Sequence, residues 1–197
     1  MVEKKEDLGL YQSQVQTDVS FTAFMTAVVV FFTGLLLTEF ESYDISIKVP
    51  ISFLIISIFG FLYSTMIFSN AAGEINQGRL AKAKKHLLLG DILSEYLGVY
   101  LLIISLPLII NVITTDTFLR GVTVVSSLAG LALYQFSHFS VLEQHFKEGY
   151  DVFAAAILLF AIGLFFAQLF KWYFAQLSIV FLLFVLYITY LAIKRNM

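Results

Sequence analysis

Three ionisable side chains lie inside long apolar stretches of this sequence. Asp91 and Glu95 have i, i+4 spacing within the stretch 90–113, so both lie on one face of the predicted helix. His138 lies within the next stretch, 122–142. Ionisable groups inside membrane helices are costly and normally face the bundle interior or a wet cavity. Together these residues predict a polar site in the interior.

The two stretches are joined by a short turn near Thr117, which predicts an antiparallel helix pair and allows depths to be compared. Glu95 lies about 22 residues before that turn and His138 about 21 residues after it, so both occupy one level. Asp91 and Glu143 are each about 26 residues from the turn and share a second level. The sequence therefore predicts an acid–histidine pair with an acid–acid pair beside it.

The chemistry of these groups suits a cation or a proton. Tyr134 precedes His138 by one helical turn, so we expect it on the same face. Glu95, His138 and Asp91 together could ligate Zn²⁺, Mn²⁺ or Fe²⁺, and a carboxylate against a histidine also suits a proton relay. No residue is predicted to be catalytic, and no cofactor can be named. The alternative is that these side chains are helix caps, interfacial charges and interhelical hydrogen bonds.

Small residues form a second pattern. Ala156, Gly163 and Ala167 make a seam along the stretch 152–170, and Gly60 lies in the stretch 49–69. Small residues let membrane helices approach closely. We expect these positions to be packing contacts, either within the bundle or between copies of the chain.

The elements that must position these residues follow from composition. Of the 197 residues, 59% are hydrophobic and 13% are charged, whereas a soluble domain has about 25% charged residues. A bilayer crossing requires about 20 mostly apolar residues. Six stretches qualify, and they predict an all-α integral membrane protein with a single domain, a bundle of six transmembrane helices at about residues 19–38, 49–69, 90–113, 122–142, 152–170 and 176–193.

The positions of lysine and arginine predict the orientation. Basic residues are retained on the cytoplasmic side. With the N-terminus inside, nine of the 12 fall in cytoplasmic segments, and only Lys48, Arg120 and Lys171 fall outside. We therefore expect a multi-pass protein of the plasma membrane with both termini in the cytoplasm.

The longest connection, 70–89, is predicted to be a basic cytoplasmic loop. Its cations are Arg79, Lys82, Lys84 and Lys85. They could contact anionic lipid headgroups from an amphipathic segment lying along the inner leaflet. The alternative is an ordinary loop whose charges serve topology.

Several classes of function find no support. The chain has no cysteine, which excludes disulfides and thiolate metal sites, and its net charge of −2 gives no basic field for nucleic acid. The first apolar run, of about twenty residues, is longer than a signal peptide core, so we expect a retained helix. No phosphate-binding glycine loop, nucleophile elbow or zinc-protease helix is present.

The favoured function is movement of a small ion or solute, as a channel or transporter, through an interior open to the cytoplasm. An intramembrane metal-dependent enzyme acting on a lipid is one alternative, and enzymatic activity is the less favoured hypothesis. A non-catalytic subunit or assembly factor of a membrane complex is the other. The expected partners are membrane lipids and either further copies of the chain or a membrane-complex partner.

Overall fold

The computed structural model describes residues 3–136 and 150–196. Within them the protein is all-helical, which confirms the all-α prediction. Five helices of the described chain are long and apolar enough to cross a membrane: Tyr11–Thr38, Ile45–Asn76, Leu80–Ile113, Thr117–Tyr134 and Phe174–Arg195. The predicted stretch 152–170 forms a helix as well, of which the portion Ala155–Leu169 is apolar but shorter than the others.

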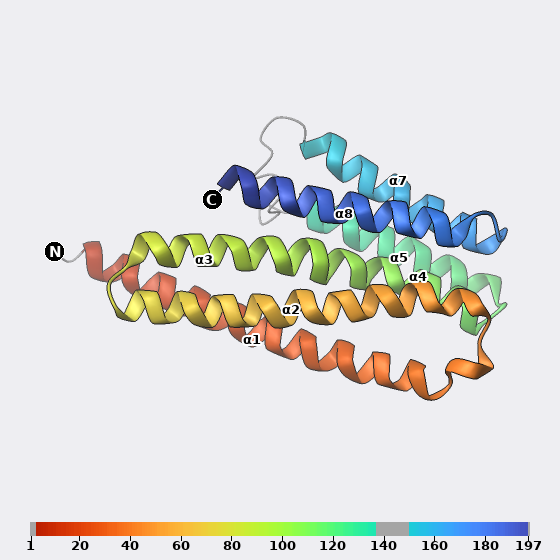
Figure 1. The fold of residues 1–197 in the computed structure, drawn as a ribbon, viewed down its shortest axis with the longest axis horizontal. Helices are drawn as coiled ribbons and strands as arrows, with labels where there is room; N and C mark the ends of the chain where they lie inside the picture. Colours follow the sequence, from red (N-terminus) through yellow and green to blue (C-terminus); the bar gives the residue numbers. More distant parts are fainter. Residues whose placement is uncertain (1–2, 137–149, 197) are drawn as a thin grey trace.

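The helices run back and forth along one axis, so that both termini lie at the same end (Figure 1). In chain order they are α1 Glu3–Thr38, the short turns η1 Phe40–Ser42 and η2 Ile45–Ile47, α2 Lys48–Asn76, α3 Leu80–Leu93, the π-helical segment η3 Ser94–Val99, α4 Tyr100–Ile113, α5 Thr117–Phe136, α7 Tyr150–Leu169 and α8 Phe174–Asn196.

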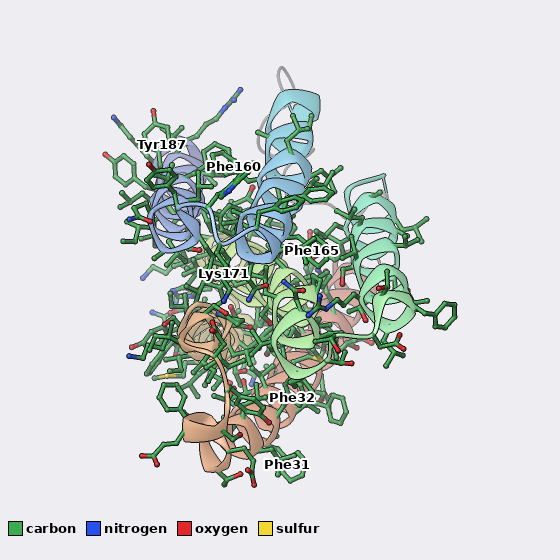
Figure 2. The ribbon with its side chains drawn as sticks, turned by 90° about the vertical axis from the view of Figure 1, so that its right-hand side faces the viewer. Phe31, Phe32, Phe160, Phe165, Lys171 and Tyr187 are labelled. Carbon is green, nitrogen blue, oxygen red and sulfur yellow. The ribbon has the colours of Figure 1, made fainter. Side chains whose placement is uncertain are left out.

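The segments α3, η3 and α4 form one continuous rod at the centre of the molecule. The α2 helix packs along all three of them, while α5 and α7 contact α4, and α8 contacts α3 and η3. Viewed end-on, α1 and α2 lie on one side of the rod and α7 and α8 on the other (Figure 2). Leu101 and Leu108 of the rod are fully buried in the main apolar core, together with Phe181 of α8.

Glycines set the contact between α2 and the rod. A Cβ atom added at Gly60 would lie 2.7 Å from the backbone nitrogen of Gly98, closer than real side chains approach. The ring of Phe61 occupies the Cβ position of Gly98, and that of Phe68 occupies the Cβ position of Gly90. The two backbones can approach this closely because these positions lack side chains.

Helix length divides the molecule into two parts. The α1 helix has 36 residues and α5 has 20, or about 54 and 30 Å at 1.5 Å per residue. The surplus of α1, together with the adjoining ends of α2 and α3, projects beyond the described ends of the other helices (Figure 1). This three-helix extension has its own core, formed by Val15, Phe68, Ala71, Ile75, Ala83 and Leu87.

The prediction of a basic loop at 70–89 needs correction, because most of this segment is helical. The α2 helix continues to Asn76 and α3 begins at Leu80, so the connection is a tight turn. Gly78 has φ 73°, and the bonds Arg79 N–H to Glu74 O and Gly78 N–H to Ile75 O form a Schellman motif. The residues after the turn are mostly strong helix formers, and Ala83 and Leu87 bury one face. Since α3 continues directly into η3 and α4, it does not lie across the rod as a separate in-plane helix.

Candidate functional site

Glu95 is the most buried charged residue of the described chain, with 0% of its surface exposed. It lies in η3, at the middle of the central rod. Its Oε1 accepts a hydrogen bond from the Tyr100 hydroxyl. The backbone N–H of Tyr100 bonds to the Glu95 carbonyl, five residues back, which is the π-helical pattern.

The π-helical segment explains how these two side chains meet. In a regular α-helix, residues five apart point about 140° away from each other, since each residue turns the chain by about 100°. The wider turn of η3 brings Tyr100 back to the face of Glu95. On the other side of η3, the Ser57 hydroxyl of α2 donates to the Gly98 carbonyl at 2.8 Å, which satisfies a buried acceptor within the irregular turn.

Tyrosine rings surround the Glu95–Tyr100 pair. The Tyr96 and Tyr100 ring centroids are 5.7 Å apart, and Tyr134 of α5 contacts Tyr100 edge-on at 6.1 Å. The hydroxyl of Tyr96 is buried without a hydrogen-bond partner among the described residues. The site therefore combines a carboxylate with hydroxyl groups that can both donate and accept.

Two further carboxylates approach this site from the side of the extension. Asp91, one helical turn before Glu95, is half-buried and lies within electrostatic range of both Glu95 and Asp18 of α1. The Oδ2 atom of Asp18 is buried and has no hydrogen-bond partner in the parts of the chain that the structure describes. Three helical segments thus each contribute one acid to this region.

Of the residues predicted for this site, the structure brings three together: Asp91, Glu95 and Tyr134. His138 and Glu143 lie outside the described residues, so the acid–histidine pair and the acid–acid pair remain predictions. Within residues 3–136 and 150–196, no group of three histidines and acids is close enough to hold a metal ion. The hypothesis of a metal on Glu95, Asp91 and His138 therefore still depends on His138.

A second polar cluster, which was not predicted from the sequence, lies near the other end of α4. The Asn111 Nδ2 donates to Gln168 Oε1 at 3.1 Å, and Gln168 Nε2 donates to the Leu108 carbonyl at 3.0 Å. Arg120 of α5 donates from Nε to Thr114 O at 2.7 Å and from Nη2 to Asn111 O at 2.9 Å. Asn111 and Gln168 are solitary amides in separate apolar stretches, so only the packing of α4 against α7 reveals that they form a pair.

The predicted packing residues have different surroundings. Gly60 lies against the backbone of η3, as described above, and Ala167 is buried in the main core while Ala156 is half-buried. At Gly163 an added Cβ would meet no described atom within 4 Å, so of the two predicted kinds of contact the one within the bundle is not seen there, and a contact between copies of the chain stays a prediction. An apolar cavity of about 290 Å³ between α7 and α8 lies there instead, lined by Gly163, Leu159, Phe160, Leu164 and Leu177.

The predicted headgroup-binding cations lie on the three-helix extension. Arg79 Nε is 2.6 Å from Glu74 Oε2, so this arginine has an acidic partner within the chain. The Lys84 Nζ lies 5.2 Å from the centre of the Tyr11 ring. Lys82 and Lys85 are exposed on α3. Binding of these cations to lipid remains a prediction.

The sequence matches no protein family model and no curated protein, and the fold matches no solved structure.

Proposed function

We propose that this chain is a plasma-membrane protein that crosses the bilayer six times and moves a small cation, with the proton as the first candidate. The six crossings are the five long apolar helices and α7, whose 20 residues would span about 30 Å. The observation that carries the proposal is the complete burial of Glu95 in a π-helical turn at the centre of the bundle. Such turns occur frequently at functional sites.

The surroundings of Glu95 favour a cation over other solutes. Asp91 and Asp18 place two further carboxyl groups near Glu95 on the side of the extension, and carboxylate oxygens are ligands for cations rather than anions. The Tyr100 hydroxyl can donate to a carboxylate or accept from a carboxylic acid. Glu95 could therefore bind and release a proton while keeping its hydrogen bond.

The orientation that we propose places the extension and both termini in the cytoplasm. The short helices match a hydrocarbon core of about 30 Å, so the extension lies beyond the bilayer on the side of the termini. Nine of the 12 lysines and arginines belong to that side. Reporters fused after Met197 test this orientation: a fluorescent protein that folds only in the cytoplasm should be bright, and an exported phosphatase should be inactive. An active phosphatase would refute it.

Proteoliposomes test the transport proposal. The purified full chain is reconstituted with an entrapped pH dye, a potassium diffusion potential is imposed with valinomycin, and proton entry is followed; Na⁺ and K⁺ fluxes are measured in parallel. We expect flux of one of these cations above that of empty liposomes, and loss of that flux in Glu95→Gln. Glu41→Gln, an exposed acid in η1, is the control and should behave as wild type. Flux in Glu95→Gln equal to wild type, or no flux of any of these cations through wild type, would refute the proposal.

The cavity at Gly163 favours a second candidate function, that of a subunit in a membrane complex. The groove between α7 and α8 is apolar, and the missing side chain at Gly163 leaves room for a knob from a neighbouring helix. This candidate predicts that Gly163→Leu shifts the protein to a smaller species on blue native gels, while Leu159→Ala, which enlarges the groove, does not. An unchanged species in Gly163→Leu would remove this candidate.

A further inference from the structure

A polar cavity of about 290 Å³ opens at the end of the molecule opposite the termini. It lies where the α1–α2 connection, the α4–α5 turn and the α7–α8 turn meet. Its polar lining includes Asp44, Ser46, Asn111, Thr115, Arg120 and Lys171. Figure 2 faces this end and shows Lys171 at the α7–α8 turn. The volume is just below the range of about 300–1,000 Å³ that is typical of small-molecule sites.

The hydrogen bonds around Asn111 determine which atom of its side-chain amide has no hydrogen-bond partner. A backbone carbonyl can only accept, so Gln168 must present Nε2 to Leu108 and therefore turns Oε1 toward Asn111. Asn111 must then present Nδ2 to Gln168. Only 8% of Asn111 is exposed, and its Oδ1 is buried without a hydrogen-bond partner in the described parts of the chain. Buried polar atoms are normally hydrogen-bonded, and Asn111 lines the cavity, so a donor bound there could supply the missing partner.

Side chains of both charges line the same cavity as Asn111. Two of the five N–H donors of Arg120 hold the carbonyls of Asn111 and Thr114, which fixes the guanidinium at the cavity. Lys171 Nζ lies 3.9 Å from Asp44 Oδ2, and both side chains are more than half exposed. An exposed pair of this length is weak and can open to admit a ligand.

We propose that this cavity binds a zwitterion whose phosphate or carboxylate meets Arg120 and Lys171, and whose primary ammonium donates to Asn111 Oδ1 and Asp44. An anion alone would give the Asn111 acceptor no donor, and a cation alone would give no acceptor to the N–H groups of Arg120 that do not bond to the two carbonyls. A ligand with both groups satisfies both. This inference does not depend on the proposed cation transport.

Two sources could supply such a ligand. One is the headgroup of phosphatidylethanolamine in the adjoining leaflet, and the other is a free amino acid. The exposed aromatic residues Trp172 and Tyr173, 67% and 77% exposed, follow directly after Lys171 and suit the headgroup level of a bilayer. They favour the lipid, and the experiment separates the two sources.

Native mass spectrometry of the purified full chain tests the proposal with lipids of identical acyl chains. Phosphatidylcholine has the same phosphate as phosphatidylethanolamine, but its quaternary ammonium has no N–H to donate. We therefore expect phosphatidylethanolamine to be retained about tenfold more strongly, the effect of one charge-assisted hydrogen bond. In a second arm, glycine and O-phosphoethanolamine are titrated into delipidated protein by calorimetry to test a soluble source.

Exposed residues provide variants that should still fold. Lys171→Gln and Asp44→Asn should each reduce binding several-fold, whereas Lys48→Gln, an exposed lysine at the same end that does not line the cavity, should not. Loss of phosphatidylethanolamine selectivity in the two variants identifies the lipid source. Binding of glycine or O-phosphoethanolamine that weakens in the same variants, without lipid selectivity, identifies the soluble source. The proposal is overturned if both lipids bind equally and neither soluble zwitterion binds, or if Lys171→Gln and Asp44→Asn bind as wild type does.

Discussion

Glu95 and Asn111 are both buried polar residues of the central rod, about 24 Å apart at 1.5 Å per residue, and their surroundings differ. Asn111 belongs to a network of amides and a guanidinium that links α4, α5 and α7 and satisfies the carbonyls at the end of α4. Glu95 lies in an irregular turn, next to other acids and tyrosine hydroxyls.

The two surroundings indicate different roles. The Asn111 network replaces backbone hydrogen bonds that a helix end lacks, so stability alone accounts for most of it. Burying a carboxylate costs free energy even when it is hydrogen-bonded. Glu95 therefore adds little to folding that an amide could not supply. This favours a functional role for Glu95 and a structural role for the hydrogen bonds that join Asn111, Gln168 and Arg120, apart from the ligand site proposed beside them.

The largest expected effect is a separation of transport from stability at Glu95. Glu95→Gln keeps the shape and a hydrogen bond to Tyr100 but removes the charge. We expect cation flux to fall at least about tenfold, equivalent to about 1.4 kcal/mol of activation free energy, and the melting temperature in detergent to stay equal or rise. A melting temperature that falls as far as the flux would place Glu95 with the structural residues.

Gln168→Leu should show the reverse pattern. It leaves the Asn111 amide buried without its partner, at a cost of about 1–2 kcal/mol, while flux per folded protein is unchanged. The double variant Asn111→Leu with Gln168→Leu should recover part of the loss, because no unpaired amide then remains. Stability is measured by thermal denaturation. If Gln168→Leu and the double variant lose the same amount of stability, the proposed pairing of the two amides is contradicted.

Gly60→Ala tests whether η3 depends on its contact with α2. The new methyl would overlap the backbone of Gly98 and Leu97, so we expect destabilisation of about 1–3 kcal/mol and reduced flux as the Glu95 turn is displaced. Gly163→Ala is the matched control, because its Cβ position is open. Equal melting temperatures for the two alanine variants would show that α2 does not constrain the turn.

The smallest effect concerns Asp44, near the Asn111 end. The backbone N–H of Ser46, with Lys171 nearby, lowers the pKa of Asp44 below its ordinary value of 3.8. Because the pKa of Asp44 is lower in the folded state, the ionised carboxylate stabilises the protein above about pH 4. This stabilisation is lost as the pH falls through the lower, folded-state pKa. Because Asp44 is exposed, the difference between wild type and Asp44→Asn should stay below about 1 kcal/mol. We expect the difference in melting temperature to shrink from pH 5 toward pH 3, and a constant difference would contradict this role.

The sequence alone predicts part of the Glu95 site and none of the Asn111 network. Asp91, Glu95 and Tyr134 could be found because an ionisable or polar residue in an apolar stretch is conspicuous, and antiparallel pairing lets depth be counted along the chain. Tyr100 could not be found, because helical periodicity places it on a different face from Glu95 until the π-helical turn is known. Asn111 and Gln168 are uncharged, and their partnership depends on which helices pack together.

The sequence by itself determined the helical class, the apolar stretches and the acidic residues within them, because the length and hydropathy of a segment are local properties that a bilayer or a core selects directly. Only the tertiary structure decided that residues 70–89 continue two helices, that Gly60 rather than Gly163 permits a close contact, and that Tyr100 meets Glu95. These features depend on distances between segments far apart in the chain and on one irregular turn, and residue spacing along a regular helix contains neither kind of information.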